Sequence, residues 1–298
     1  MDVYSSSPEK IKLIDVKNFL RENLKTEVEK YFGIQDNQWL ERVTNNWFDV
    51  QKDYTGRWKV IKEKSELNSK ILDMAAGCGT FVLFGLNHGY DVWGVEPETW
   101  KREYFLKKIN ACNYSSSYAD HILEGVGESL PFEDNFFDIV TTYQTLEHVQ
   151  CVQTCIIEML RVLKPGGCLY IQCPDYNSFF EPHYRIPFLP KMNKKIAKIY
   201  LKLIGKPTLG LDTLQWTTEK EIITIIDSSN YIVKIEQTGL KNPDHRRIKI
   251  INKLPKYLQH SFYVYLIDWI YKIKQEIKKI SLIGRRENHV SLWITKIQ

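Results

Sequence analysis

A short glycine-containing stretch, Asp73 to Phe81, has the composition of a loop that holds a ligand by its backbone. It joins an apolar run to a helix-like segment, and Gly77 and Gly79 would let the backbone approach a ligand where that helix begins. Glu96 ends a second apolar run about 20 residues further on, where a carboxylate can accept hydrogen bonds from ribose hydroxyls. The loop and the acid together indicate a site for an adenosine nucleoside.

The spacing of the glycines separates two classes of adenosine ligand. A dinucleotide fingerprint needs a third glycine, and Val82 occupies that position here. Asp73 also places a carboxylate at the mouth of the loop, where it would repel a pyrophosphate but suits a ligand that carries an amino group and a sulfonium. The residues therefore favour S-adenosylmethionine over a dinucleotide.

Two acid–base side chains, Glu147 and His148, follow another apolar run at 137–142. A histidine with an ordinary pKa can exchange a proton near neutral pH, so His148 is a candidate general base and His183 is a second candidate. The alternative is structural, because Glu147 and His148 could cap and orient the next helix while His183 packs or lies at the surface. Both interpretations stay open.

The segments between these residues alternate apolar runs with amphipathic stretches, which is typical of a parallel sheet with crossover helices. We predict an α/β fold, with a Rossmann-like, seven-stranded, mostly parallel sheet and helices on both faces. Strands are expected at 70–73, 91–96, 122–124, 137–142, 168–173, 231–237 and 290–297, and helices at 80–87, 152–163 and 218–228. Lys164 to Gly167 reads as a turn before the fifth strand.

The chain divides into an N-terminal helical cap at 1–66, rich in aromatic residues, and a main domain at 67–298 with insertions at about 177–216 and 241–288. Both insertions are basic, because 182–207 holds seven Lys or Arg and no acid, and 241–288 holds twelve against four. If the last strand is antiparallel, both insertions emerge at the carboxyl ends of the parallel strands, where such sheets bind ligands. They would then overhang one pocket.

Five motifs in order make the chain resemble class I S-adenosylmethionine-dependent methyltransferases, in the type 11/12-like group that includes ubiquinone-pathway and glycan-modifying enzymes. The resemblance covers roughly Leu72 to Tyr176 and extends weakly to the last strand. Its motifs are Asp73 to Phe81, Glu96, Gly125 to Phe132, Thr145 to Val149, and Leu163 to Gly167.

The resemblance implies that S-adenosylmethionine is the methyl donor and S-adenosylhomocysteine the product. Asp73, Gly77 and Gly79 would contact its methionine end, Glu96 its ribose, and Gly127 with Glu128 its adenine through backbone groups. Ala75, Phe81 and Gln144 complete the expected cofactor-binding set. Two positions depart from the family. Ala75 replaces a loop glycine, a change that should be tolerated if its φ is negative, and Val126 stands where many relatives have an aspartate.

The resemblance also frames the chemistry at Glu147, His148 and His183, which we predict as the catalytic set. Methyl transfer is an in-line displacement, so alignment of the acceptor does most of the work, and a base such as His148 matters for a hydroxyl acceptor. Some ubiquinone-pathway relatives bind a divalent metal through Glu-x-x-Glu-His. Gln144 occupies the first of those positions here, so we predict no metal.

The acceptor is expected to be a small or carrier-linked molecule, and an anionic one because of the basic insertions. Its predicted contacts are Tyr143, Asp175, Tyr176, Tyr184 and Arg185. The stretch from Pro182 to Pro190 resembles a segment of methyltransferases in cell-surface polysaccharide synthesis, which favours a sugar or glycan hydroxyl.

Other functions stay open. The enzyme could methylate a quinone precursor or another aromatic compound, using the N-terminal Trp and Tyr residues, or the chain could be a non-catalytic adenosyl-binding partner protein. The segment 258–280 has apolar residues at helical spacing among lysines, which fits a packed helix, an anionic membrane surface or a phosphorylated acceptor. Nucleic acid is disfavoured because no recognition module is visible.

The expected compartment is the cytoplasm, with the inner membrane surface as an option. No secretory signal is visible at the N-terminus, and the six cysteines include no CxxC pair, which fits buried thiols in a reducing compartment. The sequence predicts no oligomeric state.

Overall fold

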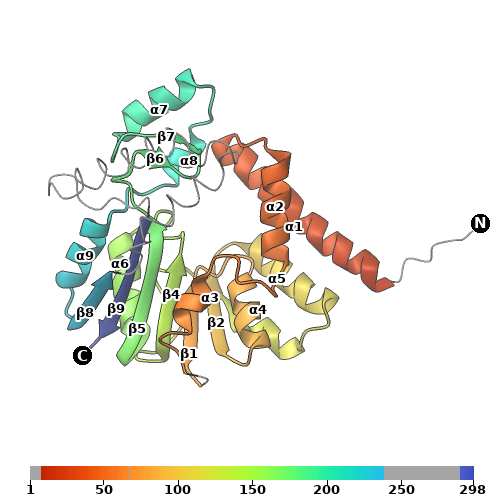
Figure 1. Ribbon diagram of the computed structural model, residues 1–298, viewed down its shortest axis with the longest axis vertical. Coiled ribbons are helices and arrows are strands. Elements are labelled where there is room, and N and C mark those ends of the chain that lie inside the picture. Colours follow the sequence, from red (N-terminus) through yellow and green to blue (C-terminus); the bar gives the residue numbers. More distant parts are fainter. Residues whose placement is uncertain (1–7, 67, 238–288) are drawn as a thin grey trace, which may run out of the picture.

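The computed structural model describes residues 8–66, 68–237 and 289–298, and its main sheet has seven strands in the order β3-β2-β1-β4-β5-β9-β8 (Figure 1). The strands are β1 (Lys70–Met74), β2 (Asp91–Glu96), β3 (Ile122–Glu124), β4 (Phe137–Tyr143), β5 (Leu163–Pro174), β8 (Val233–Gln237) and β9 (His289–Lys296). Neighbouring strands from β3 to β5 run parallel, and β9 is antiparallel to both β5 and β8. The predicted α/β fold class is confirmed.

The chain reverses its direction of travel across the sheet between β1 and β4, which pair in parallel although β2 and β3 intervene in the sequence. At such a switch point the loops after the two strands diverge, and open α/β sheets bind ligands there. β1 and β4 are almost fully buried, as expected of central strands covered on both faces. The fold thus places the loop after β1 and the segment after β4 at the two sides of one crevice.

Helices cover both faces of the sheet (Figure 1). Side chains of α6 (Val152–Val162) and α9 (Glu219–Asp227) share one apolar core with β4, β5 and β9. Side chains of α3 (Arg57–Ile61), α4 (Thr80–Asn87) and α5 (Thr99–Ala111) share the other core, together with the 3-10 helix η1 (Ser116–His121). α6 and α9 are amphipathic at the expected spacing, whereas α4 is buried over almost its whole length. Thr218 caps α9 through its hydroxyl, which accepts from the Glu221 N–H.

Trp58 of α3 fixes the N-terminal segment to the sheet domain. Its indole N–H donates to the Phe81 carbonyl at 3.0 Å, and its ring stacks on Phe81 at a centroid distance of 4.4 Å. Gly85 of α4 leaves the space that the ring occupies, because a Cβ there would lie 2.4 Å from the indole. α3 is therefore packed into α4 as part of the same core.

The remaining N-terminal helices are α1 (Pro8–Phe32) and α2 (Asn37–Phe48), which pack on α5 through an apolar cluster that includes Leu20, Leu40 and Tyr104. The Asp36 carboxylate caps α2 by accepting from the Trp39 N–H. The carboxyl end of α1 reaches the insertion after β5, where Phe32 meets Tyr184 edge to face at 5.2 Å. α1 therefore spans from α5 to that insertion (Figure 1).

The first insertion is a small subdomain above the carboxyl ends of the strands (Figure 1). It consists of the hairpin of β6 (Phe180–Glu181) and β7 (Ile186–Pro187), followed by α7 (Lys194–Leu203) and α8 (Leu209–Asp212). Its core is formed by Tyr184, Phe188, Leu201 and Leu211 with Phe32 of α1. The second predicted insertion, 241–288, and the helix expected at 258–280 lie outside the described residues.

Two local expectations were wrong. Lys164 to Gly167 is not a separate turn but part of β5, which begins at Leu163; a bulge opposite Phe137 to Ile139 takes up the extra residues. The strand expected from Tyr231 begins two residues later, at Val233. Among the described residues, no helix has both the length and the apolar character needed to cross a membrane.

Candidate active site

A cavity of about 1190 Å³ lies at the carboxyl ends of β1, β2 and β4. Its floor consists of the segments that follow these strands, and α1 and α2 contribute its outer wall. The hairpin segment from Phe180 to Arg185 contributes the far end. One space therefore reaches from the glycine-containing loop to the first insertion.

The loop after β1 needs a left-handed backbone at three positions, Ala75 (φ 62°), Gly77 (φ 57°) and Gly79 (φ 71°). The condition under which an alanine would be tolerated here, a negative φ, is not met at Ala75, so this residue carries the steric cost that glycine avoids. Gly79 begins α4, and a Cβ there would lie 2.3 Å from the Phe105 ring, whereas the position of a Cβ at Gly77 is open. Ala75 and Gly77 line the cavity, and Gly79 lies behind them in the core.

Glu96, at the end of β2, holds the loop in place. One carboxylate oxygen accepts from the Gly77 N–H at 2.7 Å and the other from the Glu98 N–H at 3.0 Å. Burial raises the pKa of Glu96, although Lys101 and the two backbone donors oppose the shift. Each oxygen keeps a lone pair, so a ribose hydroxyl could still donate to this side chain.

Asp73 forms a buried ion pair with Arg57 of α3. The guanidinium donates to both carboxylate oxygens at 2.6 and 3.0 Å, and its carbon lies 3.9 Å from the centre of the Phe81 ring. Burial raises the pKa of Asp73 to about 6, while Arg57 acts in the opposite direction, so the carboxylate is ionised at neutral pH. Arg57 and Phe81 line the cavity, and Asp73 lies behind them.

Gly127 and Glu128 line the cavity beside β1, as predicted for cofactor contacts. Gly127 is closely packed, since a Cβ there would lie 2.8 Å from the Met74 sulfur. One oxygen of the Glu128 carboxylate, Oε1, accepts from the N–H groups of Gln150 and Cys151 at the beginning of α6. Val126, at the position where many relatives have an aspartate, also lines the cavity.

The far end of the cavity is formed by Tyr143, Gln144, His148, His183 and Arg185. Gln144 adopts a left-handed backbone (φ 55°), and its N–H donates to the Gln172 carbonyl at 2.8 Å, which turns the chain away from β4. The two histidines therefore lie in the same space as the glycine-containing loop.

The Nε2 atoms of His148 and His183 face each other at 3.1 Å, although the residues are 35 positions apart. The Glu147 Oε1 lies 4.0 Å from His148 Nε2 and 3.8 Å from His183 Nε2. Glu147 is fully buried, and burial raises its pKa to about 7. Neither of its oxygens accepts a hydrogen bond from any other residue that the structure describes.

His183 is held by a buried carboxylate. Its Nδ1 lies 2.7 Å from the Glu181 Oε1 and 3.4 Å from the Tyr176 hydroxyl. Burial opposes the charged imidazole, but the hydrogen bond that His183 donates to Glu181 and the charges of Glu181 and Glu147 raise the pKa of His183 overall. For His148, burial and the neighbouring His183 lower the pKa.

Three residues predicted to contact the acceptor do not line the cavity. Tyr176 and Tyr184 are buried at 3% and 2% exposure, and Asp175 at 8%. The Asp175 carboxylate accepts from the Asn177 N–H in the turn after β5, while the Tyr176 hydroxyl and the Tyr184 N–H both donate to Glu181. These two tyrosines hold the carboxylate that positions His183, and Tyr143 and Arg185 are the predicted acceptor contacts that reach the cavity.

The sequence analysis missed Arg57, Glu181 and the wall contributed by α1. Glu27 of α1 lines the cavity, and one of its oxygens is buried without a hydrogen-bond partner among the described residues. A usable signal existed for Arg57, because a basic residue beside a buried tryptophan needs an acidic partner. No local sequence pattern identifies Glu27 or Glu181 as residues of the site.

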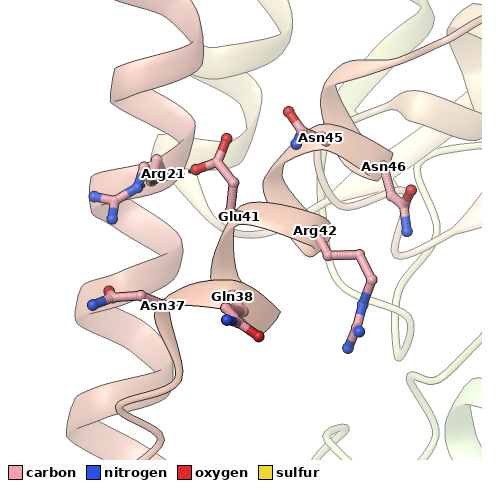
Figure 2. A pocket seen from close by; sticks show the side chains of 7 residues that line it. All are labelled: Arg21, Asn37, Gln38, Glu41, Arg42, Asn45 and Asn46. Carbon is pink, nitrogen blue, oxygen red and sulfur yellow. Dashed lines mark ion pairs between the residues drawn. The ribbon is translucent and has the colours of Figure 1, made fainter.

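A second hollow lies between α1 and α2, and Figure 2 shows the polar side chains around it. Arg21 and Glu41 form an ion pair across it at 3.6 Å. This hollow is open and lined by polar residues, and none of the candidate catalytic or cofactor-binding residues described above lines it.

Comparison with known proteins matches residues 72–171 to a family model described as "Methyltransferase domain". This segment contains β2 to β4 and most of β1 and β5, which is the part of the chain that supplies the floor of the cavity.

The curated relatives resemble the same region. The chain is 33% identical over 150 residues to an uncharacterized methyltransferase of Schizosaccharomyces pombe, which covers 44% of this chain and 47% of that protein. It is 32% identical over 144 residues to a ubiquinone/menaquinone biosynthesis C-methyltransferase of Neisseria meningitidis, covering 43% and 54%. A demethylmenaquinone methyltransferase of Staphylococcus saprophyticus is 29% identical over 181 residues, covering 58% and 73%. The chain thus spans about half the length of the first of these relatives.

Proposed function

We propose, from the premise that residues 72–171 are a class I S-adenosylmethionine-dependent methyltransferase domain, that this protein methylates a hydroxyl of a sugar, glycan or other anionic or carrier-linked small molecule. One observation carries the proposal. A single cavity joins a nucleoside-type loop and its acid, Glu96, to a pair of histidines at the opposite end. A methyl donor and an acceptor could therefore meet inside it.

In this proposal S-adenosylmethionine lies across the loop after β1. Its ribose would bond to Glu96, and its adenine would pack beside Gly127, where the backbone is accessible from the cavity. Arg57 lies beside the loop with its Nε buried and without a described partner, so the guanidinium could bind the carboxylate of the methionine end. The Asp73 carboxylate would then act through Arg57, by holding it in place.

The acceptor would occupy the end lined by Tyr143, His148, His183 and Arg185. Transfer of the methyl group breaks the bond between sulfur and methyl and forms one between oxygen and methyl, and the hydroxyl proton must leave. A neutral His148, whose pKa is lowered, could accept that proton. Replacement of His148 by alanine is expected to leave cofactor affinity intact and to abolish turnover, and retained turnover would remove the base assignment.

An aromatic acceptor such as a quinone precursor is the second candidate. The observation that favours it is the aromatic wall contributed by α1 and α2, where Tyr31, Phe32, Trp39 and Trp47 line the cavity. Apolar rings of this kind suit a flat apolar acceptor better than a sugar. Turnover of a catechol or naphthol acceptor but of no sugar would favour this candidate.

Contact with an anionic membrane surface would bring a carrier-linked acceptor to the cavity. α7 supports this part of the proposal, because Ile196, Ile199 and Leu203 are 58%, 60% and 81% exposed and Lys195 and Lys202 are exposed among them. Exposed apolar and basic side chains on one helix suit an interface with anionic lipid. Sedimentation with phosphatidylglycerol vesicles should exceed that with phosphatidylcholine vesicles and should fall in the double variant Ile199→Ser, Leu203→Ser.

The first experiment is calorimetric titration of the full chain with S-adenosylmethionine, S-adenosylhomocysteine and NAD. Binding of the first two at micromolar concentration, weakened by Glu96→Ala and by Asp73→Ala but not by Glu41→Ala in the outer hollow, would support the proposed cofactor. Binding of NAD alone, or of none of the three, would overturn it.

A further inference from the structure

Three side chains beside the far end of the cavity, two that line it and one buried behind them, direct their electron-pair donors at one point. Within the described part of the chain, donor atoms of Glu147, His148 and His183 all lie within 4.8 Å of one another. The two residues after β4 and the one in the hairpin segment are brought together only by the fold. Such convergence needs a cation or a proton to offset the repulsion between lone pairs.

The hydrogen bonds of the two imidazoles indicate where their protons are. His183 has a carboxylate at its Nδ1, so in the neutral ring that nitrogen carries the proton and its Nε2 presents a lone pair. The Nε2 of His148 faces the Nε2 of His183 at 3.1 Å. Both Nε2 atoms are therefore set up to donate electron pairs to the space beside Glu147.

A single shared proton does not satisfy this arrangement. It could join the two imidazoles at 3.1 Å, but the Glu147 carboxylate would remain buried without a partner among the described residues. An unpaired buried carboxylate is strongly destabilising. A divalent cation between the three groups would satisfy all of them at once.

The separations of the donor atoms match a metal site. Ligand atoms about 2.0–2.1 Å from a tetrahedral Zn²⁺ lie roughly 3.3 Å from one another. Here the three separations are 3.1, 3.8 and 4.0 Å, so small side-chain movements would bring all three atoms to that distance. Two imidazoles and one carboxylate suit a first-row transition metal, whereas Mg²⁺ and Ca²⁺ prefer oxygen ligands.

The surroundings supply the outer hydrogen bonds that metal sites need. A ligating histidine usually donates its other N–H to a carboxylate or a carbonyl, which fixes the ring. Glu181 does this for His183, and the Tyr176 hydroxyl and the Tyr184 N–H in turn donate to Glu181. These buried groups have no access to the cavity, so holding His183 in place explains why they are there.

We propose that Glu147, His148 and His183 form a binding site for a divalent transition metal ion, with Zn²⁺ as the best match, and that its open coordination position faces the cavity. The three donors alone support the metal site. The further step, that the ion binds and orients an oxygen of the acceptor, rests on the proposed function. It is an alternative to the base role of His148, because an Nε2 that ligates the ion cannot also accept a proton. The metal site also gives Glu147 a role, because this buried side chain does not itself line the cavity.

The test is metal binding by the full chain after dialysis against a chelator. Titration with Zn²⁺ in competition with a chromophoric chelator should give one equivalent bound at micromolar or lower concentration, and Co²⁺ should give the visible absorption of a site with nitrogen and oxygen ligands. His183→Ala and Glu147→Gln should each weaken binding by about 100-fold or more, and Glu181→Gln by about 10- to 100-fold. The exposed His88, replaced by alanine, is the control and should bind as the parent does.

The outcomes separate the two proposals. Circular dichroism identifies any variant that fails to fold, and His183→Gln, which keeps the size of the side chain, then replaces His183→Ala. Absence of Zn²⁺ or Co²⁺ uptake at a metal concentration 100-fold above that of the protein would overturn the metal site. Uptake that survives loss of both histidines would also overturn it. Failure to bind S-adenosylmethionine while Zn²⁺ binds would instead overturn the proposed function alone.

Discussion

The guanidinium of Arg57 and the carboxylate of Asp73 meet through two hydrogen bonds, 2.6 and 3.0 Å long, with both side chains buried. One residue comes from the N-terminal helices and the other from the first strand of the sheet, so this pair joins the two parts of the chain beside the cavity. This ion pair contributes both to the stability of the fold and to the shape of the cavity beside the loop after β1.

Removal of Arg57 should therefore be costly. Arg57→Ala leaves the Asp73 carboxylate buried without its partner, and we expect the free energy of unfolding to fall by about 3–5 kcal/mol. Arg57→Lys keeps the charge but loses the paired geometry and should have a smaller effect. Urea denaturation measures both. Arg21→Ala, which removes a partly exposed ion pair with Glu41, is the control and should cost less than about 1 kcal/mol.

Replacement of Glu96 by glutamine should weaken cofactor binding more than it weakens the fold. The amide would offer the Gly77 N–H one acceptor instead of a charged carboxylate, and it would lose the charge that favours ribose hydroxyls. A hydrogen bond to a charged group is worth about 1.5–3 kcal/mol, so the dissociation constant should rise about 10- to 100-fold. Glu103→Gln, at an exposed position of α5 that does not line the cavity, serves as the comparison in the same calorimetric titration, and equal losses in the two variants would contradict a specific role for Glu96.

Ala75→Gly should stabilise the protein, against the usual trend for glycine. The φ of 62° at this position strains an alanine, and glycine removes the strain. We expect the free energy of unfolding to rise by about 1 kcal/mol. Ala76→Gly, one residue on and without a positive φ, should shift it by a similar amount in the opposite direction. Two shifts of the same sign would contradict the backbone assignment.

Stability should depend on pH through Lys108 of α5. This lysine is 1% exposed and donates to the carbonyl of Phe48, and burial lowers its pKa to about 8. Between pH 8 and its ordinary pKa of 10.5 the unfolded chain holds a proton that the folded chain has lost, so raising the pH favours the folded chain.

The test for Lys108 compares the pH dependence of unfolding in the parent with that in a Lys108→Met variant. Relative to Lys108→Met, the free energy of unfolding of the parent should rise through this window by up to about 1.4 kcal/mol per pH unit. Subtracting the variant removes the tyrosine and cysteine titrations that both chains share. Lys107→Met, at a more exposed position of the same helix, should show the parent's slope.

The sheet and the nucleoside loop were predictable because their signals are local. Each strand is an apolar run, and the loop combines glycines with an acid at a fixed distance, so Gly77 and Glu96 could be assigned before any contact was known. The φ of Ala75 could not, because alanine rarely takes that conformation and only the packing of the loop imposes it.

The part of the site that could not be predicted from the sequence depends on contacts between residues that are far apart in the chain. Arg57 reaches Asp73 across 16 residues, and His148 meets His183 across 35. Tyr184 follows His183 directly, yet Tyr184 is buried in the core of the first insertion while His183 lines the cavity, and Phe32 of α1 contacts both rings. These placements depend on a helix more than a hundred residues away along the chain.

The packing of Trp58 against Gly85 has a consequence for engineering. Because the indole fills a gap in α4 that only glycine leaves, the N-terminal helices are not an exchangeable lid. A chain cut before the first strand would carry a ring-shaped hole in its core and an unneutralised acid at Asp73. Transplanting these helices from another enzyme to change acceptor preference would require the arginine, the tryptophan and the glycine to move as one unit.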